Sequence, residues 1–334
     1  MSRAFLFPGQ SSRYSGLLSK MVALSPENRA LASRASELIE LDVLGHFDQH
    51  AEQAFARNVD VQVGVFLANH MWLRTMEAHG VDAELSAGLS LGEWNHLVHI
   101  GAVSFEDALL AVRARGEAYD AGPRGFMASI QPVDLEELQE VVHAVREAEI
   151  GLVEIVNLNS PRQHVVAGDQ PAVEEVMRRV EDDLFGQPVV IERHVPMHAS
   201  SFAPVGERFR EVLESVEFRK PNRPYFPNRL GRELERPTRE DFIELLSTHV
   251  HSPVLWRATI DHLVGTRPDI TLIEVGPMKV LFNLMNRKWI KNAKFHTDAR
   301  DEVTDHVSSV VSKILATGAS PTAARPSLSK PSSL

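Results

Sequence analysis

The stretch Ser86-Ala87-Gly88-Leu89-Ser90-Leu91-Gly92-Glu93-Trp94 decides the fold of this chain. It contains the pattern Gly-x-Ser-x-Gly, which is typical of a serine on a sharp turn between a strand and a helix. Glycines flank the serine because side chains there would collide where the strand folds back into the helix. The pattern predicts an exposed Ser90 hydroxyl at a helix N-terminus, where the unpaired amide of Leu91 and the helix dipole stabilise an oxyanion.

Length and composition narrow the classes of protein that this chain can be. Its 334 residues are 43% hydrophobic, which is enough for a full core, and we expect two structural units. The net charge of -10 argues against a nucleic-acid surface, because phosphate binding needs clustered positive charge. The sequence has no cysteine, so disulfides, thiolate zinc sites and a cysteine nucleophile are excluded. Covalent chemistry must therefore use oxygen or nitrogen.

The start of the chain and its hydropathy predict a location. No run approaches the ~18 apolar residues of a membrane span. Met1-Ser2-Arg3 leads directly into a short apolar run and not into the core of a signal peptide. We expect a cytoplasmic protein without a membrane segment.

Short apolar runs that end in turns predict the strands of a large α/β unit. Ala4 to Phe7 is one such run and ends at Pro8-Gly9, while Thr271 to Val275 is another and ends at Gly276-Pro277. Between them, residues 26–80 are predicted to be helical. An amphipathic segment at 63–73 begins directly after Gln62.

A further helix is predicted from Ser104 to about Tyr119. Ser104 precedes Phe105-Glu106-Asp107, which is an N-cap followed by acidic residues in the first turn. Arg115 lies on this helix, where an arginine is ordinarily solvated.

From Gly125 the pattern changes to shorter alternating elements. Strands are predicted at 126–130, 153–158, 164–167 and 189–193, with helices at 135–148 and 172–184. The order βαββαβ is that of a ferredoxin-like subdomain, inserted here into the larger α/β unit. Asn157-Leu158-Asn159-Ser160-Pro161 is predicted to form a polar turn that is either only a turn or faces a cleft.

Two histidines are candidates for a general base. His198 lies in the loop Val195-Pro196-Met197-His198-Ala199, after a strand and before a helix from about Pro204. An imidazole titrates near neutrality and can take a proton from a serine, although a lone histidine is usually structural. His249, in Thr248-His249-Val250-His251, is the second candidate.

Together these segments resemble the malonyl-CoA:acyl carrier protein transacylase family, including the free-standing acyltransferases that serve polyketide synthases. The resemblance extends from about Ala4 to Arg287, and several motifs occur in the family's order. They are Phe7-Pro8-Gly9-Gln10, Gly88-Leu89-Ser90-Leu91-Gly92-Glu93, Arg115-Gly116-Glu117, Asn157-Leu158-Asn159-Ser160-Pro161, Pro196-Met197-His198, Ser252-Pro253-Val254-Leu255-Trp256 and Glu274-Val275-Gly276-Pro277 with Lys279-Val280-Leu281.

The resemblance implies a fold and its limits. An α/β-hydrolase-like large subdomain with a parallel sheet would comprise residues 1–124 and 196–315. A ferredoxin-like subdomain would comprise 125–195. Residues 316–334, rich in Ser, Pro and Ala, would be a disordered tail.

The resemblance also implies a ping-pong S-malonyltransferase of polyketide or fatty acid biosynthesis. Ser90 would carry the acyl group as an ester, and His198 would be the general base. The backbone amides of Gln10 and Leu91 would form the oxyanion hole. Arg115 would bind the free carboxylate of a malonyl group through two parallel hydrogen bonds.

Other site residues follow from the same resemblance. Gln62 would lie in the acyl pocket near the arginine, and Asn157 and Asn159 would line the cleft. The family orients its base by a main-chain carbonyl or by a glutamine; His249 stands at that glutamine position. Two departures affect the substrate: Leu89 offers only apolar contact, and the adaptable Met197 would admit a larger acyl group. Malonyl is the expected group, with a substituted malonyl group as the alternative.

The implied partners are a coenzyme A thioester and an acidic acyl carrier protein with a phosphopantetheine arm. We expect no bound cofactor, no metal, no nucleic acid and a monomeric chain. Two basic clusters are candidate docking patches or solvated helix faces, and Arg13 is a candidate for a coenzyme A phosphate. The clusters are Arg287-Lys288 with Lys291 and Lys294, and Arg178-Arg179 with Arg193.

Two alternatives stay open at this point. An acyl hydrolase that clears stalled acyl groups from carrier proteins would use the same Ser90 and His198, but it would not need the carboxylate-binding Arg115. A non-catalytic docking subunit would need neither Ser90 nor His198.

Overall fold

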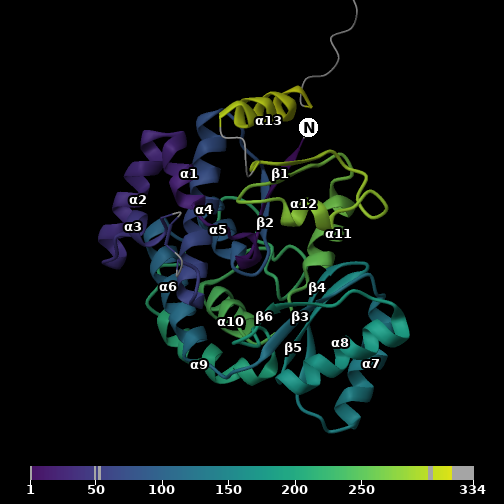
Figure 1. The fold of residues 1–334 in the computed structure, drawn as a ribbon. Helices are drawn as coiled ribbons and strands as arrows, with labels where there is room; N and C mark the ends of the chain where they lie inside the picture. Colours follow the sequence, from purple (N-terminus) through teal and green to yellow (C-terminus); the bar gives the residue numbers. More distant parts are fainter. Residues whose placement is uncertain (1, 49, 52–53, 300–303, 318–334) are drawn as a thin grey trace, which may run out of the picture.

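The computed structural model describes residues 2–48, 50–51, 54–299 and 304–317 (Figure 1). The predicted disordered tail lies outside these ranges, except for residues 316 and 317, where the last helix ends. In chain order the elements are β1 (Arg3–Phe7), η1 (Gln10–Ser12), α1 (Leu17–Leu24), α2 (Pro26–Ile39), α3 (Val43–His46), α4 (Asn58–Ala78), β2 (Leu85–Gly88), α5 (Gly92–His99), α6 (Phe105–Asp120), β3 (Phe126–Ile130), α7 (Leu135–Glu147), β4 (Val153–Ser160), β5 (Gln163–Gly168), α8 (Gln170–Leu184), β6 (Val189–Glu192), η2 (Ser200–Phe202), α9 (Ala203–Leu213), α10 (Arg239–His249), α11 (Trp256–Thr266), β7 (Thr271–Glu274), α12 (Val280–Leu284), β8 (Lys294–His296) and α13 (Thr304–Ala316).

The first sheet is parallel, with the strand order β2-β1-β7-β8. Because parallel strands end at the same edge of a sheet, the loops after β1, β2 and β7 lie side by side. The amide of Leu89 donates to the carbonyl of Phe7 at 2.9 Å, and that of Val275 donates to Leu6 at 2.9 Å. This edge therefore collects Pro8-Gly9-Gln10, Leu89-Ser90 and Gly276.

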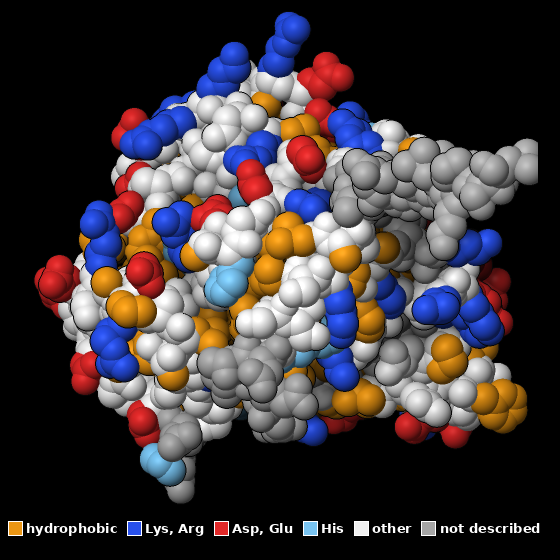
Figure 2. All heavy atoms as spheres, turned by 90° about the horizontal axis from the view of Figure 1, so that it is seen from above, with side chains coloured by type: hydrophobic (Ala, Val, Ile, Leu, Met, Phe, Trp, Pro, Cys, Tyr) orange, Lys and Arg blue, Asp and Glu red, His pale blue; other side chains and the backbone are white. Residues whose placement is uncertain are grey.

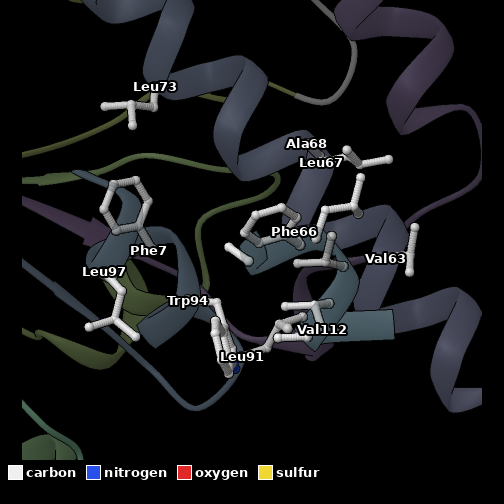
Figure 3. Close-up of a cluster of buried hydrophobic side chains, with 14 of the residues drawn as sticks. Phe7, Val63, Phe66, Leu67, Ala68, Leu73, Leu91, Trp94, Leu97 and Val112 are labelled. Carbon is white, nitrogen blue, oxygen red and sulfur yellow. The ribbon is translucent and has the colours of Figure 1, made fainter. Parts of the chain in front are cut away.

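The helix α4 is the centre of the largest core cluster, and its burial differs from the prediction. Residues 63–73 are buried all round the helix, so this segment is not amphipathic. It is enclosed because α1, α5 and α6 pack on it from different sides (Figure 1). Figure 3 shows Phe66 and Leu67 of α4 near Leu91, Trp94 and Val112. Within the described ranges, no helix is long and apolar enough to cross a membrane.

The second sheet is antiparallel, with the order β4-β5-β3-β6, which is the ferredoxin-like topology predicted for this region. Its strands alternate between two faces. Ala128 and Val166 face α7 and α8 and form a core of their own. Met127 and Val165 point to the opposite face and join the core of the parallel-sheet region. The sheet thus presents one face to its own helices and one to the remainder of the protein.

The polar stretch at 157–161 is a correction to the sequence-based prediction. Asn157 to Ser160 continue the strand β4, and the turn begins only at Pro161. The strand is longer because its pairing with β5 extends to Ser160 opposite Gln163, with two irregularities in register. Asn157 and Asn159 both line the cavity described below.

Candidate active site

A sharp turn between β2 and α5 holds Ser90. A Cβ atom on Gly88 would lie 2.0 Å from the backbone of Gly92, and one on Gly92 would lie 2.2 Å from the Phe7 carbonyl oxygen. Both positions therefore require glycine. Ser90 itself has φ of 50°, a left-handed conformation that is costly for a residue with a side chain and that the surroundings must enforce.

His198 meets the hydroxyl of Ser90, as predicted. The distance from Ser90 Oγ to His198 Nε2 is 2.8 Å, and His198 Nδ1 lies 2.7 Å from the backbone carbonyl oxygen of His249. A carbonyl only accepts, so Nδ1 carries the proton and donates it. Nε2 is left with a free electron pair, which accepts the serine hydroxyl hydrogen. The tautomer is the one that a general base needs.

The protonation of His198 is set by its surroundings. Burial and, to a smaller extent, the positive charge of Arg115 lower its pKa to about 3, although the bond to the His249 carbonyl opposes them. The imidazole is therefore neutral at pH 7 and ready to accept a proton. The same effect shows that Arg115 is close enough to influence the base electrostatically.

His249 contributes through its backbone rather than through its side chain. Its ring stacks on that of His198 with centroids 4.8 Å apart. Its Nδ1 lies 3.4 Å from Glu93 Oε2 and so faces away from the base nitrogen. His249 does hold His198 in place, but it does so through its backbone carbonyl, a group that any residue at this position would supply.

Two backbone amides at the starts of helices belong to residues close to Ser90: Leu91 follows it in the chain, and Gln10 lines the same cavity. Gln10 is the first residue of η1, and Leu91 directly precedes α5. The first amides of a helix have no partner within it, so both are suited to receive a negative oxygen. The amide of Ser90 is not available for this, because it donates to Asn228 Oδ1 at 2.8 Å.

Arg115 is buried, with 2% of its surface exposed, and is not the solvated arginine that its helix position suggested. Its Nη1 donates to Gln62 Oε1 at 2.8 Å, and its guanidinium lies 4.5 Å from the centroid of the Tyr119 ring. Arg115 Nη2 and Gln62 Nε2 have no hydrogen-bond partner within the described part of the chain. Two buried donors without acceptors suit a small carboxylate.

A cavity of about 100 Å³ opens over the serine. Its walls include most of the predicted substrate residues, which come from both sheets: Gln10, Arg13, Leu89, Ser90, Asn157, Asn159, Met197 and His198. Met127, Val165 and Ile191 add an apolar wall from the antiparallel sheet. Arg115, Gln62 and Leu91 are not among the described residues that line it.

His198 also borders a second cavity, of about 470 Å³, on the side of α7 and β4. The described residues lining this second cavity include His143, Arg146 and His251 but not Ser90. Of these two cavities, the first is the one whose described lining includes the nucleophile.

Sequence reasoning missed three buried residues behind the elbow. The side-chain Nδ2 of Asn228 donates to the Gly88 carbonyl at 2.6 Å. The backbone N–H of Asn228 donates to Glu93 Oε2 at 3.3 Å. The hydroxyl of Tyr225 donates to Glu93 Oε1 at 2.7 Å. Burial raises the pKa of Glu93 to about 7, opposed chiefly by the Tyr225 bond. Glu93 is in the quoted motif, but nothing local marks Asn228 or Tyr225.

Some members of the two predicted basic clusters are bound to neighbouring groups. Arg178 and Arg179 pair with Glu175 on α8, and Arg178 also pairs with Asp182. Lys294 Nζ donates to the backbone carbonyls of Phe282 and Met285. On the face seen in Figure 2, basic and acidic side chains are interspersed.

Arg193 is separate from the arginines of α8. It lines a cavity of about 300 Å³ together with Arg13, Arg57 and His194, and this cavity shares Arg13, Ile191 and Glu192 with the serine cavity. These are the basic residues that line the cavity adjoining the one over Ser90.

The fold and the site define an α/β protein with a nucleophile elbow under an antiparallel second sheet. Residues 4–305 match the model of the acyl transferase domain, and the chain belongs to this family. It is 31% identical over 288 residues to a malonyl CoA-acyl carrier protein transacylase of Bacillus subtilis, covering 85% of this chain and 89% of the relative. The corresponding protein of Escherichia coli K12 is 29% identical, with 85% and 92% covered.

Solved structures agree with this assignment. The malonyl CoA-acyl carrier protein transacylase of Clostridium perfringens superposes with a TM-score of 0.85 at 27% identity, covering 95% of this chain and 98% of that one. A malonyl-transacylase in complex with its type II polyketide synthase acyl-carrier protein superposes with a TM-score of 0.83 at 25% identity, covering 94% and 100%.

Proposed function

We propose that this protein moves a malonyl group from coenzyme A to the phosphopantetheine thiol of an acyl carrier protein. The observation that carries the proposal is the buried Arg115 beside the Ser90 and His198 pair, with donors of Arg115 and Gln62 unpartnered among the described residues. A malonyl thioester has a carbonyl for the serine and a free carboxylate for the guanidinium. The names of the relatives, malonyl CoA-acyl carrier protein transacylase, support the same donor and acceptor.

The first half-reaction forms an ester on Ser90. Its Oγ attacks the thioester carbonyl carbon while its proton passes to His198 Nε2. The carbonyl oxygen becomes an oxyanion that the amides of Gln10 and Leu91 stabilise. Collapse of this intermediate breaks the carbon–sulfur bond, and His198 returns the proton to the leaving coenzyme A sulfur.

The second half-reaction reverses these roles with a new thiol. His198 takes the proton of the phosphopantetheine thiol, whose sulfur attacks the Ser90 ester. The proton then returns to Ser90 Oγ as the ester bond breaks. This ping-pong scheme needs no metal and no bound cofactor, and coenzyme A enters as the thioester substrate.

The acyl pocket supports malonyl as the group transferred. The serine cavity has a volume of about 100 Å³, and its wall includes the side chains of Leu89 and Met197. Both are apolar, so neither competes with Arg115 for the carboxylate. Met197 is unbranched and adaptable, so a substituted malonyl group is the second candidate substrate.

The carrier protein would approach across the basic cavity of Arg13, Arg57, Arg193 and His194. This cavity adjoins the serine cavity, and its charge is opposite to that of an acidic carrier protein. We also propose that the protein acts as a monomer in the cytoplasm. Polyketide or fatty acid synthesis is the process served, with residues 1–124 and 196–315 as the catalytic subdomain and 125–195 as the second subdomain.

The experiment is intact-mass spectrometry of the protein with malonyl-CoA and then with a phosphopantetheinylated carrier protein. We expect a malonyl adduct that passes to the carrier, no adduct for Ser90→Ala, and loss of the preference for malonyl-CoA over acetyl-CoA for Arg115→Ala. Arg113→Ala is the matched control, because Arg113 is on the same helix but its Nε pairs with Glu117 at the surface. Release of free acid from acyl carriers, without a malonyl adduct, would indicate an editing hydrolase and overturn the proposal.

A further inference from the structure

The turn that carries Ser90 exposes backbone groups that its own helix and strand do not satisfy. Ser90 has a left-handed backbone, its amide points away from α5, and the carbonyl of Gly88 lies at the end of β2. One side chain meets both groups. Asn228 Oδ1 accepts from the Ser90 amide at 2.8 Å, and Asn228 Nδ2 donates to the Gly88 carbonyl at 2.6 Å.

We propose that Asn228 is a positioning residue for the nucleophile, acting as a two-point clamp on the backbone on both sides of Leu89. This inference rests on the proposed function, since it assumes that the Ser90 hydroxyl reacts. A side-chain amide is suited to this place because it offers one acceptor and one donor in a single plane. The clamp also withholds the Ser90 amide from any oxyanion, which leaves that role to Leu91 and Gln10.

Asn228 is itself fixed from behind. Its side chain is buried, with 2% of the residue exposed. Its backbone N–H donates to Glu93 Oε2 at 3.3 Å, and its backbone carbonyl accepts from the amide of Leu255 at 2.9 Å. Glu93 also accepts from the Tyr225 hydroxyl at 2.7 Å. The clamp is therefore anchored to α5 and to the segment before α11, and not to a mobile surface loop.

The test compares Asn228→Ala and Asn228→Asp with the wild type by the rate of Ser90 acylation from malonyl-CoA, between pH 5 and 8. We expect Asn228→Ala to lower kcat about a hundredfold at every pH, since small displacements of a reacting group have effects of this size. The Kd for malonyl-CoA, measured with Ser90→Ala in both backgrounds, should change less than about twofold. A change of Kd in place of kcat would overturn the proposal.

Asn228→Asp gives a readout that a merely structural role would not produce. A protonated carboxyl group keeps both contacts, because its hydroxyl donates to Gly88 and its carbonyl oxygen accepts from Ser90. An ionised carboxylate only accepts and repels the Gly88 carbonyl. Relative to the wild type, we expect acylation by this variant to be nearly normal at low pH and to fall as pH rises. A constant ratio at all pH values would overturn the proposal.

The ratio of the variant's acylation rate to that of the wild type at the same pH removes the effect of other titrating groups. The titratable and charged groups on the elements around Asn228 include Glu93 and His96 of α5, Tyr225 and Arg229 of its own segment, and His198, His249 and Arg115. All are present in the wild type, so their own titration cancels to first order. Asn28→Ala and Asn28→Asp are matched controls, since Asn28 is also buried and bonds to the Met21 carbonyl, away from the cavity. Their ratio to the wild type should not depend on pH.

Failure of this inference and failure of the proposed function are distinguishable. A fluorophosphonate probe labels an activated serine whatever the natural acyl donor is. If the wild type gives no malonyl adduct but reacts with the probe, the proposed function fails and the Asn228 variants are scored by the labelling rate. Unchanged labelling of Ser90 in both variants would overturn the positioning role.

Discussion

The parallel and the antiparallel sheet both border the cavity over Ser90, but they contribute in different ways. The parallel sheet contributes backbone: a turn fixed by Gly88 and Gly92, and the amides of Gln10 and Leu91 at its carboxyl edge. The antiparallel sheet contributes side chains, with Met127 and Asn157 on the wall. Reaction geometry therefore depends on the parallel-sheet region, whereas the antiparallel sheet acts through the shape of the cavity, whose wall it shares with Leu89 and Met197.

This difference has a physical cause. Parallel strands end at the same edge of the sheet, so their loops lie next to one another. Their backbones can approach closely only at glycines, which have no side chain. An antiparallel sheet with helices on one face leaves its other face as an ordered array of alternate side chains. The converging loops of the parallel sheet therefore tolerate few substitutions. Substitutions on the open face of the antiparallel sheet should have only local effects. The following predictions test this contrast, beginning with the largest expected effect.

His198→Ala should lower the rate of Ser90 acylation by about 10³-fold or more, because no other group in the described structure meets the serine hydroxyl. Rapid-quench intact-mass spectrometry with malonyl-CoA measures this rate. His251→Ala is the control, since His251 lines the second cavity and not the one over Ser90. A rate for His198→Ala within tenfold of the wild type would contradict the assignment of the base.

Gly92→Ala should lower the free energy of unfolding by about 3 kcal/mol or more and abolish acylation, since its Cβ would lie 2.2 Å from the Phe7 carbonyl oxygen. Chemical denaturation provides the measurement. Gly265→Ala in α11 is the matched control, because a Cβ there meets nothing within 4 Å. That control should be neutral or stabilise by about 0.5–1 kcal/mol. Equal effects of the two substitutions would show that the turn does not need its glycine.

Asn159→Ala, on the antiparallel sheet, should raise KM for malonyl-CoA by about threefold to tenfold and leave kcat nearly unchanged. The side chain lines the cavity and donates to Gln163 Oε1 at 3.0 Å, but it does not touch Ser90 or His198 in the described structure. Steady-state kinetics separates the two constants. Gln170→Ala, at the exposed start of α8, serves as the control. A fall in kcat without a change in KM would contradict this prediction, because it would show that Asn159 acts on the chemical step and not on binding.

The stability of the parallel-sheet region should fall modestly in acid. Burial lowers the pKa of His70 and His96 to about 3 and of His99 to about 4, so their stabilising contribution is present above pH 6.5 and is lost as pH falls. Burial raises the pKa of Glu93 and Glu274 to about 7, and these act in the opposite direction, stabilising most below pH 4.5.

The contribution of the three histidines to the pH dependence of stability is the larger one, because they outnumber the two glutamates and most of their pKa values are shifted further. We expect Tm to decrease by a few degrees between pH 7 and pH 5. Amides of β2 and α5 should lose hydrogen-exchange protection before those of β3 and β5. His96→Asn should flatten the dependence of Tm on pH, whereas His143→Gln, at the exposed surface of α7, should not. Earlier loss of protection in β3 and β5 would reverse the expected order.

Residues within one local pattern were predictable, and residues joined by distant contacts were not. The Ser90 turn and the βαββαβ order depend on spacing that a sequence displays, and the structure has both. Met197 and His198 follow from a motif, and the structure places them at the cavity. The helix α4 was misread as amphipathic because its periodicity gives no sign of how many neighbours enclose it.

His249 and Asn228 show what the sequence could not supply, whereas the family resemblance had already placed Arg115 near Gln62. An arginine on a capped helix is ordinarily solvated, yet this one is buried beside Gln62, 53 residues away in the chain. His249 was a second candidate base and a candidate for orienting His198, and it is its backbone carbonyl that accepts the hydrogen bond from His198. Asn228 lies 138 residues from Ser90 and belongs to no motif.

The sequence alone determined where the serine turn, the alternating strands and the candidate base lie, because glycine sterics, two-residue alternation and residue type act over a few neighbouring positions. Only the tertiary structure decided which atoms meet. The tautomer of His198, the burial of Arg115 and the contacts of Asn228 depend on groups that chain folding brings together from 51 to 138 positions apart. Hydrogen bonds act over about 3 Å in space, whatever the separation along the chain.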